Sequence, residues 1–171
     1  SRHKGSMHLP ELFCEEMRGY TLVLILGKED VPTDILEQLI QCGERFGVFL
    51  EFARRLTDVE KFVEFKRAKL LLFPSQFEGF GYPPVEAQYC GTHCVAFDLP
   101  VLRETCGDRL YLAESGNWSD FRTKVAEALT NPQDSSTFKD CIDPVAQLST
   151  TTTRLGSILS DLLKVDLPSR K

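Results

Sequence analysis

Two glutamates bracket two glycines in the stretch that follows an apolar run, and a pair of prolines lies between the second glycine and the second glutamate. Glu78 and Glu86 are eight positions apart, and Gly79 and Gly81 lie between them. The prolines at 83–84 suit the first turn of a helix, because proline there gives up donors that a helix leaves unpaired anyway. Glycine lets the backbone come close to a ligand, and free amides at a helix N-terminus favour an anion such as a diphosphate. This stretch therefore predicts an anion-binding loop that opens a helix.

The two acids need a different partner, because a carboxylate repels a diphosphate. An ionised carboxylate accepts two hydroxyl donors at once, which suits the diol of a ribose or a hexose. The prolines have no N–H, so the amide donors must come from residues 79–82 or from Val85 onward. A nucleotide diphosphate-sugar reconciles amides in the middle with acids on either side. The alternative is that Glu78 and Glu86 are solvated acids favoured by the helix dipole.

The loop is set in a chain where apolar runs alternate with helical patterns. Strands alternating with helices predict an α/β fold, with a Rossmann-like parallel sheet and helices on both faces. Ligands on such sheets bind at the carboxyl ends of the strands, which directs attention to the loop after Phe73. The predicted strands cover residues 21–26, 48–52, 69–74, 94–97 and 110–112, and the predicted helices cover 9–17 (weakly), 33–43, 58–68, 83–91, 119–129 and 155–163.

A longer string around the loop can be compared with known families. It consists of Phe73-Pro74-Ser75, Glu78-Gly79-Phe80-Gly81, Pro84-Val85-Glu86-Ala87, Gly91-Thr92, Pro100-Val101-Leu102-Arg103-Glu104 and Gly107-Asp108. This string resembles the donor-binding, C-terminal half of the retaining GT-B glycosyltransferases of family 4, whose signature is the spacing between the two glutamates. The similarity extends more loosely over residues 21–163, which is most of the chain.

The resemblance assigns a role to each part of the loop. It implies that Glu86 holds the nucleotide ribose, and that Glu78 is the catalytic residue, which orients the donor sugar and stabilises charge there. The backbone of residues 79–81, together with Tyr82, would face the sugar and the diphosphate. The implied reaction transfers a hexose-type sugar from a UDP- or GDP-linked donor to an acceptor hydroxyl, with retention at the anomeric carbon and without a metal or other cofactor.

The chain also departs from that family. Nothing in it matches the N-terminal half that would bind the acceptor, whether glycan, lipid or small molecule, and the intact enzyme could associate peripherally with a membrane. The family's first strand of this half ends in a Gly-Arg pair with a lysine a few residues on, and we find no such strand before Leu9. Lys28 follows a strand and is the candidate phosphate contact. The expected organisation is a vector-derived leader at 1–7, one domain at 8–165 and a tail at 166–171.

Composition excludes several other classes of protein. A net charge of −5 and a pI near 5.3 disfavour a nucleic-acid partner, and no apolar run reaches the roughly 20 residues of a membrane span. The six cysteines are scattered and form no CxxC pair, so we expect reduced thiols in a cytoplasmic protein. Cys90, His93 and Cys94 lack a fourth ligand for zinc.

Other functions remain as alternatives to the transferase. A dehydrogenase is disfavoured because Pro84 occupies the third glycine position of a dinucleotide fingerprint. A non-catalytic scaffold with the same fold would need neither glutamate, and a sugar-nucleotide epimerase would not need the whole string. Arg54 and Arg55 could reach the donor's base or phosphate, although a solvated pair is the simpler interpretation.

Overall fold

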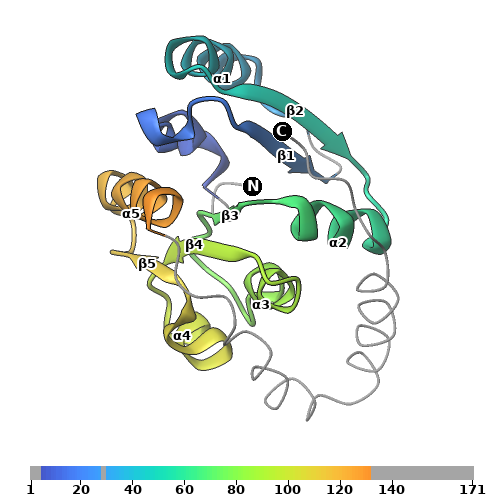
Figure 1. The fold of residues 1–171 in the computed structure, drawn as a ribbon, viewed down its shortest axis with the longest axis vertical. Coiled ribbons are helices and arrows are strands. Elements are labelled where there is room, and N and C mark those ends of the chain that lie inside the picture. The colour runs from blue at the N-terminus through green and yellow to red at the C-terminus, as the bar shows by residue number, and fades with distance from the viewer. Residues whose placement is uncertain (1–4, 28–29, 132–171) are drawn as a thin grey trace.

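The computed structural model describes residues 5–27 and 30–131, and it has the predicted α/β architecture. The strands are β1 (Thr21–Leu26), β2 (Phe49–Arg54), β3 (Leu70–Phe73), β4 (His93–Phe97) and β5 (Tyr111–Ala113). The helices are α1 (Thr33–Phe46), α2 (Asp58–Arg67), α3 (Tyr82–Tyr89), α4 (Pro100–Cys106) and α5 (Trp118–Thr130), with short 3₁₀ turns η2 (Ser6–Leu12), η3 (Glu15–Met17) and η4 (Gly107–Arg109). Figure 1 shows α1 beside β1 and β2, and α3, α4 and α5 around the other three strands. The last predicted helix, at 155–163, lies outside the described residues.

All strand pairs are parallel, but among the described residues they form two hydrogen-bonded groups instead of the single predicted sheet. One group is β1-β2 and the other is β3-β4-β5. In the first group Leu26 is level with Arg54. In the second, Phe73 is level with Ala96 and Phe97 with Ala113. In-register parallel pairing therefore brings the carboxyl ends of the strands to one edge of each group, where the loops of interest begin.

The core centres on β4, whose five residues are all buried. A strand with neighbours on both sides and helices on both faces reads as a continuous apolar run, and Cys94-Val95-Ala96-Phe97 is such a run. The Phe97 ring packs edge-on against Trp118 and Phe121 of α5, with centroids 4.9 and 5.0 Å away. These contacts fix β4, and with it the adjacent β3 from which the candidate loop leaves.

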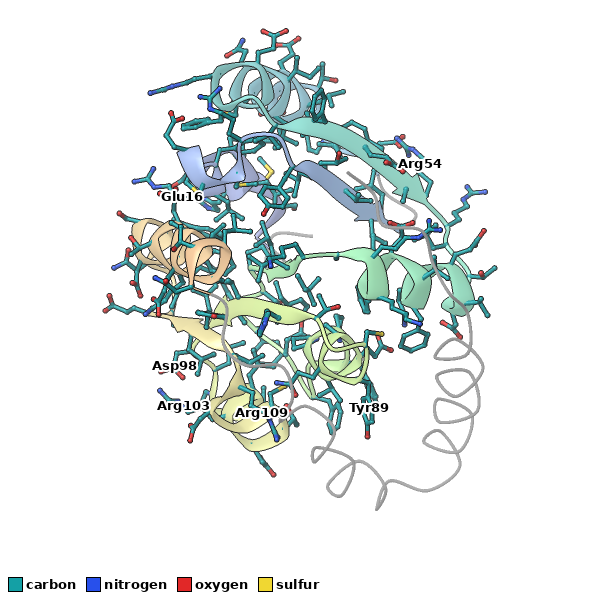
Figure 2. All side chains as sticks on the ribbon, viewed as in Figure 1. Glu16, Arg54, Tyr89, Asp98, Arg103 and Arg109 are labelled. Carbon is teal, nitrogen blue, oxygen red and sulfur yellow. The ribbon has the colours of Figure 1, made fainter. Side chains whose placement is uncertain are left out.

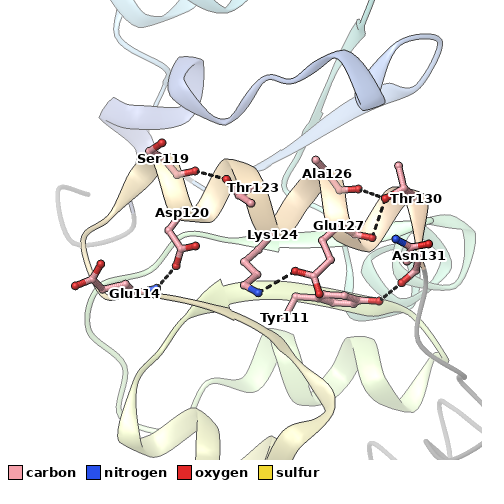
Figure 3. A network of polar contacts seen from close by, with 10 residues as sticks. All are labelled: Tyr111, Glu114, Ser119, Asp120, Thr123, Lys124, Ala126, Glu127, Thr130 and Asn131. Atoms are coloured by element: carbon pink, nitrogen blue, oxygen red, sulfur yellow. Dashed lines mark hydrogen bonds and ion pairs between the residues drawn. The ribbon is translucent and has the colours of Figure 1, made fainter.

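Helix α5 is fastened to β5 by polar contacts at both ends (Figure 3). At its start Asn117 caps the helix by accepting a hydrogen bond from the amide of Asp120 at 3.0 Å, as its residue type predicts. The Asp120 carboxylate in turn accepts from the amide of Glu114 at 2.7 Å. At the other end the Tyr111 hydroxyl donates to the carbonyl of Asn131 at 2.9 Å.

The N-terminal segment from Gly5 onward packs against the core. Residues 9–17, predicted as a weak helix, form the 3₁₀ turns η2 and η3. Gly5 is buried in a left-handed conformation (φ 71°), and a Cβ there would collide with Pro74 and Trp118. The domain boundary after residue 7 stays a prediction, but Gly5 and Ser6 already belong to the folded part of the chain.

Two helix boundaries differ from the predictions. Helix α1 continues past Gly43, where we expected its end, and ends at Gly47, which takes the left-handed cap conformation (φ 67°). Gly43 is instead packed against β2, because a Cβ there would lie 2.9 Å from the Val48 carbonyl. Helix α4 was not predicted, since its seven residues are too few to show a period. Ile40 of α1 and Val59 of α2 are exposed although both are apolar.

Candidate functional site

The candidate loop runs from the end of β3 to the start of α3. Gly81 is the N-cap of α3 and has a left-handed backbone (φ 80°, ψ 48°). A Cβ on Gly81 would collide with the fully buried side chain of Leu102. Glycine at this position is therefore required twice, by the backbone conformation and by the lack of space. Leu102 lies in α4, so packing against that helix fixes where α3 begins.

Glu86 is buried near the start of α3 and is paired with a lysine. Its carboxylate is 7% exposed, and Oε1 lies 2.8 Å from Nζ of Lys61 in α2. A buried carboxylate that carries a charge needs such a partner. This contradicts the simpler interpretation of Glu86 as a solvated acid at a helix start. Among the described residues, only Lys61 donates a hydrogen bond to this carboxylate.

The amides in the middle of the loop are the predicted anion donors. Among the described groups, none accepts a hydrogen bond from the amides of residues 79–82. The Val85 amide, the other predicted source, donates to the Gly81 carbonyl at 3.4 Å and so belongs to the helix. The structure thus narrows the candidate donors to residues 79–82.

The remaining predicted residues lie around these amides. Glu78 is half-buried, and Gly79 has open space where a Cβ would stand. The rings of Phe80 and Tyr82 are in contact, with centroids 4.6 Å apart. Lys28, the predicted phosphate contact, lies outside the described residues. The structure therefore places Glu78, Glu86 and the intervening amides on one loop and helix turn, and leaves Lys28 open.

Two arginines lie near the ends of other strands, Arg54 at the end of β2 and Arg103 in α4 after β4, and each has an acidic partner. Figure 2 labels both arginines and Asp98. Arg54, at the end of β2, pairs with Asp30 beside a small hollow lined by Val31, Leu36 and Phe52. Arg103 makes two hydrogen bonds to Asp98, at 2.5 and 2.6 Å, and this contact holds the pKa of the Asp98 carboxyl below its usual range. The second pair clamps the turn between β4 and α4, so Arg103 has a structural explanation.

A metal centre has no support in the described part of the chain, where no three candidate ligands gather. Its five cysteines carry no disulfide, and Cys141 lies outside it. Burial, together with the nearby Glu86 carboxylate, raises the pKa of the Cys90 thiol to about 12, so this thiol stays protonated. None of the described helices has the length and apolar character that a membrane crossing requires.

Lys61 belongs to no motif in the sequence. It precedes Glu86 by 25 positions and lies on another helix, so no local spacing connects the two. The available signal was weaker: Lys61 lies in the first turns of the helix after β2, at the edge where the loops gather. A charged residue there is usually a solvated one, and only the structure identifies its partner.

Comparison with known proteins identifies the family of this chain. Residues 3–141 match the family model described as glycosyl transferases group 1. The chain is 32% identical over 121 residues to the Escherichia coli serotype-specific mannosyltransferase WbdA, covering 69% of this chain and 14% of that protein. It is 23% identical over 143 residues to the O-antigen chain mannosyltransferase RfbU of Salmonella typhimurium, covering 83% of this chain and 35% of that protein.

Solved structures agree on the fold. The structure of HepE from Anabaena in complex with UDP-glucose has a TM-score of 0.65 at 20% identity, covering 95% of this chain and 46% of that one. Sucrose-phosphate synthase from Thermosynechococcus elongatus has a TM-score of 0.69 at 18% identity, covering 95% of this chain and 43% of that one. The chain thus spans less than half the length of each of these proteins. On the match over residues 3–141, it belongs to the glycosyl transferases group 1 family.

Proposed function

We propose that this chain is the donor-binding half of a retaining glycosyltransferase that moves a hexose-type sugar from a nucleotide diphosphate-sugar to an acceptor hydroxyl. The observation that carries the proposal is the buried Glu86 carboxylate, held by Lys61 on one oxygen. The Glu86 carboxylate can accept hydrogen bonds from hydroxyls, and the amides of residues 79–82 can donate to phosphate. Together they suit a ligand that has both groups.

Each part of the loop then has one task. Glu86 accepts hydroxyls of the nucleotide ribose, and the amides of residues 79–82 donate to the diphosphate. Glu78 lies toward the donor sugar, where it orients the ring and stabilises positive charge that develops at the anomeric carbon. Lys28 adds a phosphate contact. The backbone amides supply the charge stabilisation that a metal provides in other enzymes, so we expect binding without a divalent cation.

The comparisons support the donor and the division of labour. A similar structure is a complex with UDP-glucose, and several relatives are mannosyltransferases. Because this chain covers only part of each relative, the acceptor would be bound by another part of the longer protein. An acceptor glycan fits the O-antigen relatives, and a lipid or small molecule is the alternative.

A non-catalytic scaffold and a sugar-nucleotide epimerase are the competing functions. A scaffold has no need to bury a charged glutamate, which costs free energy that a neutral residue would save. An epimerase would also bind a nucleotide but would convert the donor without an acceptor. Incubating the longer protein with sugar nucleotide alone distinguishes the epimerase, because only that enzyme yields an epimeric sugar nucleotide.

Calorimetric titration of the chain with UDP and with GDP tests donor binding. We expect one of the two to bind weakly, and Glu86→Ala to lower its affinity at least tenfold, since hydrogen bonds to a charged group contribute about 1.5–3 kcal/mol. Glu37→Ala, on the exposed face of α1, is the matched control and should leave the affinity unchanged.

Two results would contradict the proposal. If the folded chain bound neither nucleotide, the scaffold would be favoured. If one nucleotide bound and Glu86→Ala bound it as tightly as the unchanged chain does, the ribose contact would be wrongly assigned, although the donor site could still stand.

A further inference from the structure

The ion pair between Lys61 and Glu86 joins α2, which precedes β3 in the sequence, to α3, which follows it. Lys61 lies in the second turn of α2, and Glu86 lies in the second turn of α3. The lysine side chain is 26% exposed and the carboxylate 7% exposed. The pair therefore lies at the margin of the core, with the lysine on its solvent side.

The backbone of α2 holds Lys61 in place. Thr57 and Glu60 form a reciprocal capping box that fixes the start of the helix. Phe62, the next residue, is buried against Phe65 of the same helix and against Ala87 of α3. A hydrogen bond from the Thr92 hydroxyl to the Phe65 carbonyl, at 2.5 Å, ties the far end of α2 to the turn after α3.

The lysine side chain itself has few alternatives. Its ammonium lies 4.9 Å from the centroid of the Phe62 ring, a favourable cation–π distance. Its other acidic neighbour, Asp58, is 3.8 Å away and largely exposed, so that contact contributes little. The 2.8 Å contact with the buried carboxylate is the dominant one.

The pair leaves acceptor capacity on Glu86. A carboxylate offers about four lone-pair positions, and Lys61 occupies one of them, on Oε1. Without a cation beside it, a carboxylate this buried would bear a large desolvation cost.

We infer that Lys61 is a positioning residue for the donor site: its contact with Oε1 orients the Glu86 carboxylate, so that the remaining acceptor positions receive the vicinal hydroxyls of the nucleotide ribose. This inference rests on the proposed function, since it assigns Lys61 a role at the same site. Lys61 acts through Glu86 and does not itself contact the ribose. A direct contact between Lys61 and the diphosphate, or a purely structural role, would give different results below.

Discrimination between ribose and deoxyribose nucleotides reports on this role. The unchanged chain should bind UDP or GDP at least tenfold more tightly than the 2′-deoxy or the 3′-deoxy analogue. In Lys61→Met, which keeps the length of the side chain but not its charge, we expect that ratio to fall below threefold. Lys61→Arg should keep the ratio within threefold of the unchanged chain. Lys124→Met is the matched control, because Lys124 makes an ion pair of the same 2.8 Å length with Glu127 on α5.

The outcomes separate the two proposals. Should Lys61→Met fail to fold, as judged by circular dichroism, Lys61→Gln replaces it with the same expected loss of discrimination. Equal loss of affinity for ribose and deoxyribose nucleotides, with the ratio unchanged, would overturn the inference in favour of a phosphate contact or a structural role, while donor binding would stand. If the unchanged chain binds a nucleotide without discriminating between ribose and deoxyribose, both the ribose contact and the role of Lys61 are wrong.

Discussion

The two ends of the loop between β3 and α3 differ sharply in how they are built. The helix end, Gly81 and residues 84–88, is closed: Gly81 is packed against Leu102, and Glu86 is buried against Lys61. The strand end, residues 76–80, is open: Phe77 is 74% exposed and Gly79 has free space where a side chain would be. One continuous motif therefore contains a rigid part and an accessible part.

This difference indicates which half of the ligand the chain can recognise by itself. The closed end is held by its own contacts, which would lower the entropic cost of binding the proposed nucleotide there. The open end, where the sugar would lie, has few contacts that define its shape. We expect its side chains to be ordered by the ligand or by the rest of the longer protein.

The two glycines give the largest test of this contrast. Gly81→Ala should lower the free energy of unfolding by about 2–4 kcal/mol, because it combines left-handed backbone strain with a clash against Leu102. Gly79→Ala should change it by less than about 0.5 kcal/mol, yet weaken nucleotide binding, since the new methyl group faces the ligand. Urea unfolding and calorimetry measure the two effects.

The contrast between the closed and the open end would be wrong if Gly81→Ala and Gly79→Ala lost the same amount of stability. It would be sharpened if Gly79→Ala proved fully stable but bound the nucleotide more weakly, because that result separates ligand approach from folding.

The thiol of Cys90, which follows the closed end in the sequence, predicts a dependence of the protein's stability on pH. The pKa of Cys90 is raised from 9.0 to about 12 by burial and by Glu86. The unfolded thiol ionises near pH 9 while the folded thiol stays protonated, so stability should fall as the pH rises from about 9 toward 12, by at most about 1.4 kcal/mol per pH unit for this group. Cys90→Ala and Cys90→Ser lack the ionising group, and urea unfolding at several pH values should give both a shallower decline.

Other groups that titrate in this range affect all three proteins alike, so the comparison rests on the difference in slope. A decline in Cys90→Ala as steep as that of the unchanged chain would show that the thiol is not shielded at the closed end.

Glu78 gives the smallest effect, at the open end. Glu78→Gln should change the affinity for UDP or GDP by less than threefold, because this residue lies toward the sugar. It should reduce the additional affinity that the sugar of UDP-glucose or GDP-mannose contributes. Calorimetry with nucleotide and sugar nucleotide in parallel gives both values. A large loss of affinity for the bare nucleotide would place Glu78 at the closed end instead.

Much of the fold could be predicted because its signals are local. The run from Leu70 to Phe73 has apolar residues at every position and stops at a proline, and it forms β3. Asn117 caps α5 as its residue type suggests. The candidate loop could be placed at a strand end for the same reason, since both its strand and its double-proline helix start are contained in one stretch of sequence.

What could not be predicted depends on contacts between distant residues. Gly43 looks like a helix end, yet it is a point of close packing against Val48. The division of the strands into two groups leaves no trace in any single strand. In the sequence Lys61 is one lysine among many charged residues. Its partner Glu86 can be identified only when α2 and α3 are placed side by side. Glu86 could be predicted as a candidate site residue, but its burial and its pairing with Lys61 could not.

Gly5 has a practical consequence for the study of this protein. Its left-handed backbone lies against Pro74, the residue with which the candidate loop begins. An affinity tag or fusion partner attached on its N-terminal side would be tethered a few residues from the ligand, where a polyhistidine or a charged linker could mimic or block a phosphate contact. Such additions belong at the other end of the polypeptide, or should be cleaved before affinities are compared.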